Sequence, residues 1–109
     1  MFNLFSKKYR NIGVAEFKEL KRKKDTVILD VRSRGEQTSG VINGQRNLNV
    51  MDKKFREQAA KLDKSKTYLL YCRSGMRSAR ACRIMSKLGF EHLYNLKGGI
   101  TAWERENTY

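Results

Sequence analysis

Short apolar runs alternate along this chain with segments whose apolar residues recur at helical spacing. The run Thr67–Tyr71 is apolar and aromatic, which is the pattern of a buried strand. In residues 77–88 the apolar side chains follow an i, i+3, i+4, i+7 pattern, which predicts a helix that ends at Gly89. Because strands and helices alternate throughout, the sequence predicts a mainly parallel sheet with helices on both faces.

The same two patterns place the remaining elements in one domain. The expected helices lie at residues 14–24, 51–62, 77–88 and 100–106; the expected strands lie at residues 27–31, 67–71 and 92–96, with a brief strand at Leu48 and Val50 and a loop with one turn of helix over residues 32–47. We therefore expect a small three-layer α/β domain with about five strands. It comprises residues 10–109, and residues 1–9 form a loosely held or edge segment at its start.

The charge of the chain points to anionic partners. Lysine and arginine number 24 against 11 aspartate and glutamate, a net charge of +13 over 109 residues, which attracts anions without specifying a fold. We do not expect nucleic acid, because no aromatic residues interleave the basic ones as a stacking platform requires. No apolar run reaches the ~20 residues that span a bilayer, and no signal-peptide pattern is present. We therefore expect a cytoplasmic protein without a membrane span.

The segment 72–78 carries the main chemical signal. It follows a predicted strand and leads into a predicted helix, and ligands of parallel sheets bind outside the carboxyl ends of the strands. Gly75 gives the backbone freedom to curl, and a tight loop entering a helix turns several N–H groups toward one point. Arg73 and Arg77 add two positive charges, and the helix N-terminus adds roughly half a charge.

These features act on the sulfur of Cys72. A thiol at a helix N-terminus beside cations has a pKa well below the ordinary ~8.5, so we predict a thiolate at neutral pH with its side chain facing solvent. The N–H groups from Arg73 to Arg77 would stabilise its charge. Such a thiolate attacks an electrophilic atom, holds it covalently and passes it on. The alternative is a structural cysteine beside a solvated basic stretch.

The length of the loop separates two chemistries. A cysteine phosphatase needs Cys-x5-Arg, whereas here the sixth position after Cys72 is Ser78 and the arginine is fifth, at Arg77. A shorter loop makes a smaller cup, which suits one sulfur atom rather than a phosphoryl group. The product would be a persulfide on Cys72.

Three segments resemble the single-domain rhodanese-like sulfurtransferases, and together they cover about residues 10–106. Ile28–Arg32 is similar to the family's strand and Asp-x-Arg signature, and Glu36, Gly40, Ile42, Gly44 and Asn47 follow at the family's spacing. The second segment, Cys72–Arg77, resembles the family's six-residue active loop; the name active loop is used for it below. The third, Leu96–Ile100 with Trp103, resembles the Gly-Gly and Trp tail. The chain departs from the family at Val41, where a histidine is usual, and it lacks the usual prolines.

The resemblance implies a rhodanese-like fold and a thiosulfate sulfurtransferase type of activity. Cys72 would be the catalytic residue, and the other residues of the active loop would bind the substrate: Arg73, Ser74, Gly75, Met76 and Arg77. The donor would be thiosulfate or a protein persulfide, and the acceptor cyanide, a small thiol or a thiol protein, with no metal or organic cofactor. A second hypothesis is a persulfide carrier that docks on a partner protein and turns over free thiosulfate slowly.

Other residues are interpreted as supporting the site. Asp30 would tie the turn after its strand, with orientation of the active loop through backbone N–H groups as the alternative, and Arg32 would join the same network. Gly98 and Gly99 would let the backbone pass close to the active loop, and Ser78 would support that loop.

Several features of the sequence have a second possible interpretation. Arg77, Arg80, Arg83 and Lys87 recur at helical spacing, as either a solvated face or a docking strip for an acidic protein. Cys82 is interpreted as a small buried hydrophobe, with a resolving thiol as the alternative. Cys72, Cys82 and His92 lack compact ligand spacing, so we expect no metal site. We expect a monomer.

Overall fold

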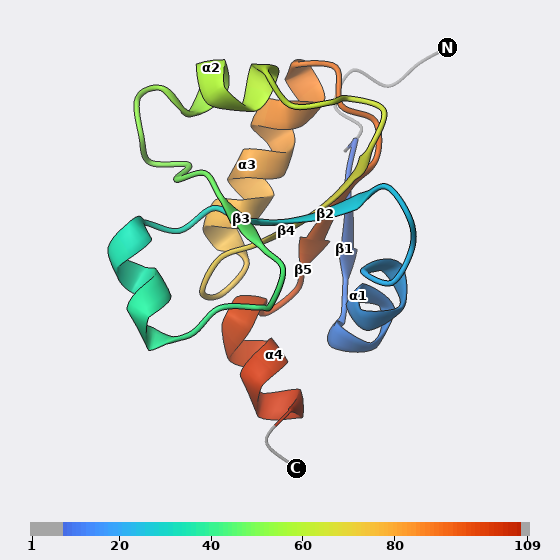
Figure 1. Ribbon diagram of the computed structural model, residues 1–109, viewed down its shortest axis with the longest axis vertical. Coiled ribbons are helices and arrows are strands. Elements are labelled where there is room, and N and C mark those ends of the chain that lie inside the picture. The colour runs from blue at the N-terminus through green and yellow to red at the C-terminus, as the bar shows by residue number, and fades with distance from the viewer. Residues whose placement is uncertain (1–7, 108–109) are drawn as a thin grey trace.

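The computed structural model describes residues 8–107, which form a five-stranded sheet with helices around it (Figure 1). All strand pairs are parallel, in the order β1-β5-β4-β2-β3. The strands are β1 (Arg10–Ile12), β2 (Thr26–Asp30), β3 (Arg46–Asn47), β4 (Thr67–Tyr71) and β5 (Leu93–Leu96); the helices are α1 (Val14–Leu20), α2 (Phe55–Ala60), α3 (Met76–Lys87) and α4 (Gly99–Glu106), and a 3-10 helix, η1, spans Arg34–Ser39. The predicted fold class is confirmed.

Strand β4 lies at the centre of the sheet and is its most fully buried strand. Its residues Tyr68, Leu69, Leu70 and Tyr71 are each at most 1% exposed, as expected for a strand covered on both faces. It pairs with β2 on one side and β5 on the other. The loop after β4 therefore emerges at the middle of the sheet's carboxyl edge, flanked by the ends of two neighbouring strands.

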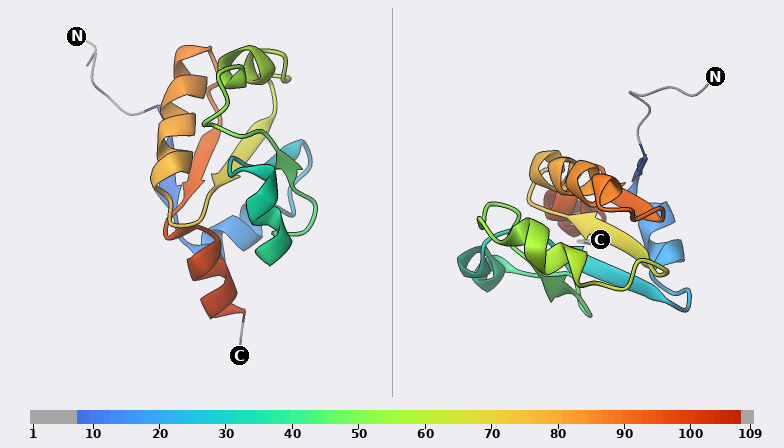
Figure 2. Two further views of the ribbon diagram at one scale, coloured as in Figure 1. Left: turned by 90° about the vertical axis from the view of Figure 1, so that its left-hand side faces the viewer. Right: turned by 90° about the horizontal axis from the view of Figure 1, so that it is seen from above.

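Helices cover the two faces of the sheet and form two separate cores. On one face α2 and α3 contribute Phe55, Ala81 and Met85 to a core that includes Leu70 of β4. On the other face α1 and α4 pack through an edge-to-face contact between Phe17 and Trp103. In Figure 1 α3 and α1 flank the strands from opposite sides, and Figure 2 shows the same layers from two further directions. This arrangement confirms the predicted helices on both faces.

Several predicted elements differ from those in the structure, and β1 lies outside the predicted strands. Helix α1 ends at Leu20 rather than residue 24, because no apolar side chain between Leu20 and Val27 could hold a further turn against the sheet. The brief strand lies at Arg46–Asn47 rather than at Leu48 and Val50.

The start of α2 is also shifted. The apolar stripe predicted from Met51 begins only at Phe55, and Met51 is 62% exposed. The N–H of Met51 is held instead by the side chain of Asn49, in the turn that precedes the helix.

The expected loosely held segment at residues 1–9 lies mostly outside the described residues. Within the described part, Tyr9 is buried at 8% exposure against the α3 side of the sheet. None of the helices in residues 8–107 is long and apolar enough to span a membrane.

Gly99 sets the closest approach between the start of α4 and the loop after β4. A Cβ atom on Gly99 would lie 2.4 Å from the carbonyl oxygen of Arg73 and 2.5 Å from that of Cys72, far inside van der Waals contact. Its φ of +60° is also left-handed. The predicted close passage of the Gly98–Gly99 backbone is therefore present, and it allows Ile100 N–H to donate to the carbonyl of Cys72 over 2.9 Å.

Replacing Gly99 with alanine should therefore destabilise the protein by about 2 kcal/mol or more, because the new Cβ meets fixed backbone at a strained φ. Urea unfolding followed by circular dichroism measures the change. Gly35→Ala is the matched control, because nothing lies within 4 Å of a Cβ at that position, and we expect it to change stability by less than about 1 kcal/mol. Equal losses in the two variants would contradict this account of Gly99.

Candidate active site

Cys72 follows the last residue of β4, and its sulfur lies at the N-terminus of α3. The backbone N–H of Gly75 donates to Cys72 Sγ over 3.1 Å, and the N–H and hydroxyl of Ser78 each lie 3.4 Å from it. Gly75 reaches this position with a left-handed φ of +103°, which favours glycine there. The predicted convergence of N–H groups on Cys72 is present, but it extends one residue beyond the active loop, to Ser78.

The surroundings of Cys72 favour its charged form. Burial by itself raises the pKa of the thiol, but the hydroxyl and N–H of Ser78 and the N–H groups of Gly75 and Ser74 outweigh burial, so the pKa lies below its ordinary value. The predicted direction of the shift agrees with the structure. The cause is hydrogen bonding from loop N–H groups, which the sequence predicted beside the charges of Arg73 and Arg77, together with the hydroxyl and N–H of Ser78.

The prediction that Cys72 faces solvent is wrong for this conformation. Cys72 is 1% exposed and packs with the core on the α3 face. Its sulfur is covered by the active loop, in which Arg73, Ser74 and Met76 are exposed. Cys72 therefore has almost no contact with solvent in this conformation.

Arg77 is engaged with Glu36 rather than free to bind an anion. Its two terminal nitrogens donate to the two carboxylate oxygens of Glu36, both over 2.8 Å. Hydrogen bonds from Arg77 lower the pKa of Glu36 from 4.5 to about 2 despite partial burial, so both groups are charged at neutral pH. Arg77, which the sequence predicted to add a positive charge to the loop, is therefore paired with a carboxylate in this conformation.

Glu36 also shapes the segment after β2. Its carboxylate accepts hydrogen bonds from the N–H and the hydroxyl of Ser33, which closes a capping box at the start of η1. Glu36 thereby links η1 to the start of α3, across 41 residues of sequence.

Asp30 and Arg32 form a buried ion pair beside the active loop. Asp30 is 0% and Arg32 is 3% exposed, and Arg32 donates to both carboxylate oxygens of Asp30, the shorter distance being 2.8 Å. Arg32 also donates to the carbonyls of Glu36 and Gly40. The structure thus supports the interpretation that these residues tie down the turn after their strand.

Tyr71 completes this buried network and was not singled out from the sequence. Its hydroxyl donates to Asp30 over 2.9 Å and accepts the N–H of Ile42. Burial raises the pKa of the Tyr71 hydroxyl, so it stays protonated and remains a donor. A hydroxyl-bearing aromatic at the carboxyl end of a buried strand was the available signal, because a buried tyrosine needs a hydrogen-bond partner.

Asn95 is the second residue that sequence reasoning missed. It is 3% exposed in β5, donates to the carbonyl of Gly75 over 3.1 Å and accepts from the hydroxyl of Ser78 over 2.5 Å. Its signal was a polar residue in an otherwise apolar strand near the carboxyl edge of the sheet.

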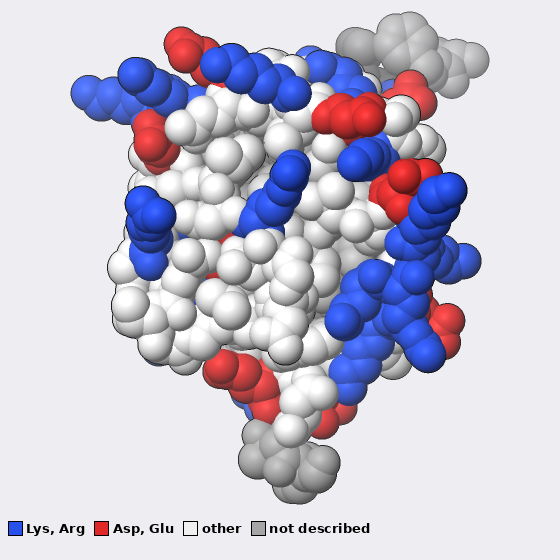
Figure 3. All heavy atoms as spheres, viewed as in Figure 1, with Lys and Arg blue, Asp and Glu red and all other residues white. Residues whose placement is uncertain are grey.

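The basic residues of α3 beyond Arg77 lie in the open. Arg80, Arg83 and Lys87 are exposed, and Arg83 approaches the hydroxyl of Tyr9 over 3.5 Å. Lysine and arginine are also spread widely around the face shown in Figure 3, whose middle is largely uncharged.

Cys82 lies on the inner side of α3 and is 0% exposed. Burial raises the pKa of its thiol, which supports the interpretation of a small buried hydrophobe. Among residues 8–107 the structure contains no group of three His, Cys, Asp or Glu side chains that could hold a metal ion.

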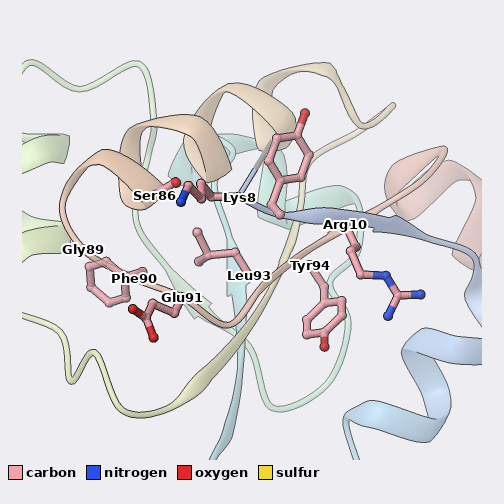
Figure 4. Close-up of a pocket in the computed structure, with 9 residues that line it drawn as sticks. Lys8, Arg10, Ser86, Gly89, Phe90, Glu91, Leu93 and Tyr94 are labelled. Atoms are coloured by element: carbon pink, nitrogen blue, oxygen red, sulfur yellow. The ribbon is translucent and has the colours of Figure 1, made fainter. Parts of the chain in front are cut away.

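Three hollows differ in their relation to Cys72. A hollow of about 480 Å³ lies between β1, β5 and the C-terminal end of α3, where Phe90, Leu93 and Tyr94 line it (Figure 4). It is at the opposite end of α3 from the active loop. A second hollow, of about 360 Å³, borders Arg73 and is also lined by Glu36 and Glu104. A third hollow, of about 380 Å³, is lined by Ser74, Gly75 and Met76, so two hollows border the active loop.

Comparison with known proteins places these features in a family. Residues 13–106 match the model of the rhodanese-like domain. A putative sulfurtransferase, YtwF, of Bacillus subtilis is 35% identical over 98 residues, which cover 89% of this chain and 92% of that protein. The thiosulfate sulfurtransferase GlpE of Coxiella burnetii is 33% identical over 96 residues, which cover 88% of each chain.

Two further matches show how much of each protein the similarity covers. A tRNA uridine(34) hydroxylase of Cytophaga hutchinsonii is 35% identical over 94 residues, but these cover only 30% of that protein and 84% of this chain. The crystal structure of a rhodanese-related protein from Thermoplasma volcanium superposes with a TM-score of 0.80 at 32% identity, covering 91% of this chain and 94% of that one.

Ser78→Ala should raise the pKa of Cys72, because it removes a hydroxyl donor that stabilises the thiolate. A hydrogen bond to a charged group is worth about 1.5–3 kcal/mol, so we expect the pH midpoint of iodoacetamide alkylation to rise by about one unit. Alkylation rates measured between pH 5 and pH 10, with mass spectrometry to separate Cys72 from Cys82, give the midpoint. Ser86→Ala on the same helix is the control, and an unchanged midpoint in Ser78→Ala would refute the role of the hydroxyl.

Proposed function

The chain belongs to the rhodanese-like domain family, and we propose that it is a sulfurtransferase in which Cys72 carries the transferred sulfur as a persulfide. The observation that carries this proposal is the set of donors from Gly75 and Ser78 aimed at one sulfur. Donors placed in this way stabilise negative charge on sulfur. The relatives named as sulfurtransferases, which match this chain over most of their length, support the same reaction.

The proposed reaction consists of two displacement steps at sulfur. In the first, the Cys72 thiolate attacks the outer sulfur of thiosulfate or of a persulfide donor, the sulfur–sulfur bond of the donor breaks, and sulfite or a thiolate leaves with the electron pair. In the second, cyanide or an acceptor thiolate attacks the outer sulfur on Cys72. The bond to Cys72 breaks, and the thiolate is regenerated.

The active loop has to open for either step, because the Cys72 sulfur is covered in the described conformation. Arg73 is exposed and borders the hollow of about 360 Å³, so it is placed to attract an anionic donor. Cys72 provides the covalent chemistry by itself, without a metal or organic cofactor.

A second candidate function is a persulfide carrier that docks on an acidic protein. The observation in its favour is the exposed basic residues Arg80, Arg83 and Lys87 on α3, together with Met76, which is 79% exposed in the active loop. A panel of donors and acceptors separates the two functions. Fast turnover with thiosulfate and cyanide favours the enzyme, whereas a very high KM for thiosulfate with tight binding to an acidic protein favours the carrier.

A phosphatase on the same fold is disfavoured by the length of the loop. The arginine of the loop is fifth after Cys72 and is bound to Glu36. Release of phosphate from an aryl phosphate would contradict the proposed sulfur chemistry.

Exposure to thiosulfate should add the mass of one sulfur atom to Cys72, and Cys72→Ser should abolish both this adduct and sulfur transfer to cyanide. Peptide mass spectrometry locates the adduct, and thiocyanate formation measures turnover. Cys82→Ser is the matched control and should keep both, because Cys82 is buried inside α3. Full thiocyanate formation by Cys72→Ser would contradict the proposed mechanism.

Glu36→Gln should lower the KM for thiosulfate severalfold at low salt, because it releases the charge of Arg77 and removes a carboxylate from the wall of the hollow. The effect should fade as salt is added. Glu16→Gln is the control, since Glu16 pairs only with exposed Arg10 among the ion pairs of the described residues. A KM that rises or stays constant in Glu36→Gln would show that Arg77 does not bind the donor.

A further inference from the structure

Asn95 lies under the active loop and is joined to the edge of the sheet. It sits in β5 directly opposite Asn11 of the edge strand β1, in the parallel register of the two strands. Figure 1 shows β1 and β5 side by side. Asn95 is 3% exposed, whereas Asn11 is exposed. A buried amide of this kind needs partners for each of its polar groups, and those partners lead toward Cys72.

The orientation of the Asn95 amide is determined by the backbone. Its Nδ2 donates to the carbonyl of Gly75 over 3.1 Å and to Oδ1 of Asn11 over 2.9 Å. Because a backbone carbonyl only accepts, the NH₂ group has to face Gly75. Oδ1 of Asn95 therefore faces the hydroxyl of Ser78, which donates to it.

The Ser78 hydroxyl has one hydrogen and two acceptors within reach. These are Oδ1 of Asn95 at 2.5 Å and Sγ of Cys72 at 3.4 Å. While Cys72 is a thiol, the hydroxyl donates to Asn95; when Cys72 is ionised, the hydroxyl turns to the sulfur. In the thiol state Asn95 thus holds the Ser78 oxygen beside the sulfur. In both states, through the Gly75 carbonyl, it holds the peptide unit next to the one that donates to Sγ.

We propose that Asn95, kept in place by Asn11, is a positioning residue for Cys72 that acts through Gly75 and Ser78. The inference rests on the proposed role of Cys72 as a nucleophile, but it concerns the geometry of the donors rather than the sulfur that is carried. It makes an exposed residue of the sheet edge, Asn11, part of the support of the active loop, although 61 residues separate it from Cys72 (72 − 11).

Asn11→Leu and Asn11→Asp test the proposal on the intact protein. Leucine removes the acceptor for Asn95, whereas aspartate keeps an oxygen in that place. We expect the alkylation rate of Cys72 at neutral pH to fall about threefold in Asn11→Leu, through a higher pH midpoint, and to stay near the original value in Asn11→Asp. Two titratable side chains of α3, Arg77 and Cys82, interact electrostatically with Cys72, and both variants leave them unchanged.

Arg10→Leu separates positioning from general loosening of β1. Arg10 is exposed and neighbours Asn11 in the same strand, but its side chain contacts Glu16 and Tyr94. We expect it to lower the thermal unfolding midpoint as much as Asn11→Leu does, without moving the pH midpoint of alkylation. The proposal is overturned if Asn11→Leu leaves that pH midpoint in place, or if Arg10→Leu or Asn11→Asp moves it equally.

This readout remains meaningful if the proposed function fails. Alkylation reports the ionisation of Cys72 whether or not the protein transfers sulfur. A shifted pH midpoint with no thiocyanate formation by the unmodified protein would overturn the function and leave the positioning role intact. Sulfur transfer by the unmodified protein, together with an unchanged pH midpoint in Asn11→Leu, would overturn the positioning role and leave the proposed function intact.

Discussion

The site depends on several hydrogen-bond donors being held around a sulfur that is out of contact with water. Burial alone would keep Cys72 protonated, so the N–H groups of Gly75 and Ser78 have to be held in place to reverse that tendency. Backbone donors of this kind cost nothing to reorganise once the fold has fixed them. The active loop can be short because Gly75 adopts a left-handed conformation and Gly99 lets α4 pass directly against the carbonyls of Cys72 and Arg73.

Three polar connections hold this arrangement from different sides. Arg32 and Asp30 fix the segment after β2, and Glu36 joins that segment to Arg77 at the start of α3. Asn95 holds the loop from below. The same pairing that orders the loop also neutralises a charge that would otherwise attract an anionic donor. The chain therefore combines a large net positive charge of +13 with a reactive loop whose second arginine is already bound to a carboxylate.

Most helices and strands, and the location of the site, could be predicted from the sequence because their signals are local. The strand Thr67–Tyr71 has the same bounds in the structure, and helix 77–88 differs by one residue at each end. The brief strand near residue 47 was misplaced because its position depends on Asn47, whose side chain donates to the carbonyls of Asp30 and Arg32. No periodicity in the sequence encodes that contact.

The sequence by itself determined a mainly parallel sheet, most of its strands and helices, and a cysteine at the carboxyl end of a buried strand, since apolar periodicity and glycine placement act over a few residues. The edge strand β1 and the order of the strands in the sheet came only from the structure. Only the tertiary structure decided that the sulfur is covered, that Arg77 is bound to Glu36, and that Asn95 and Tyr71 support the site. These outcomes arise from hydrogen bonds between residues 41 positions apart in the case of Arg77 and Glu36 and 84 apart in the case of Asn95 and Asn11. Such partners come together only after the sheet has formed, because the register of the strands, rather than any local preference, places them within reach of one another.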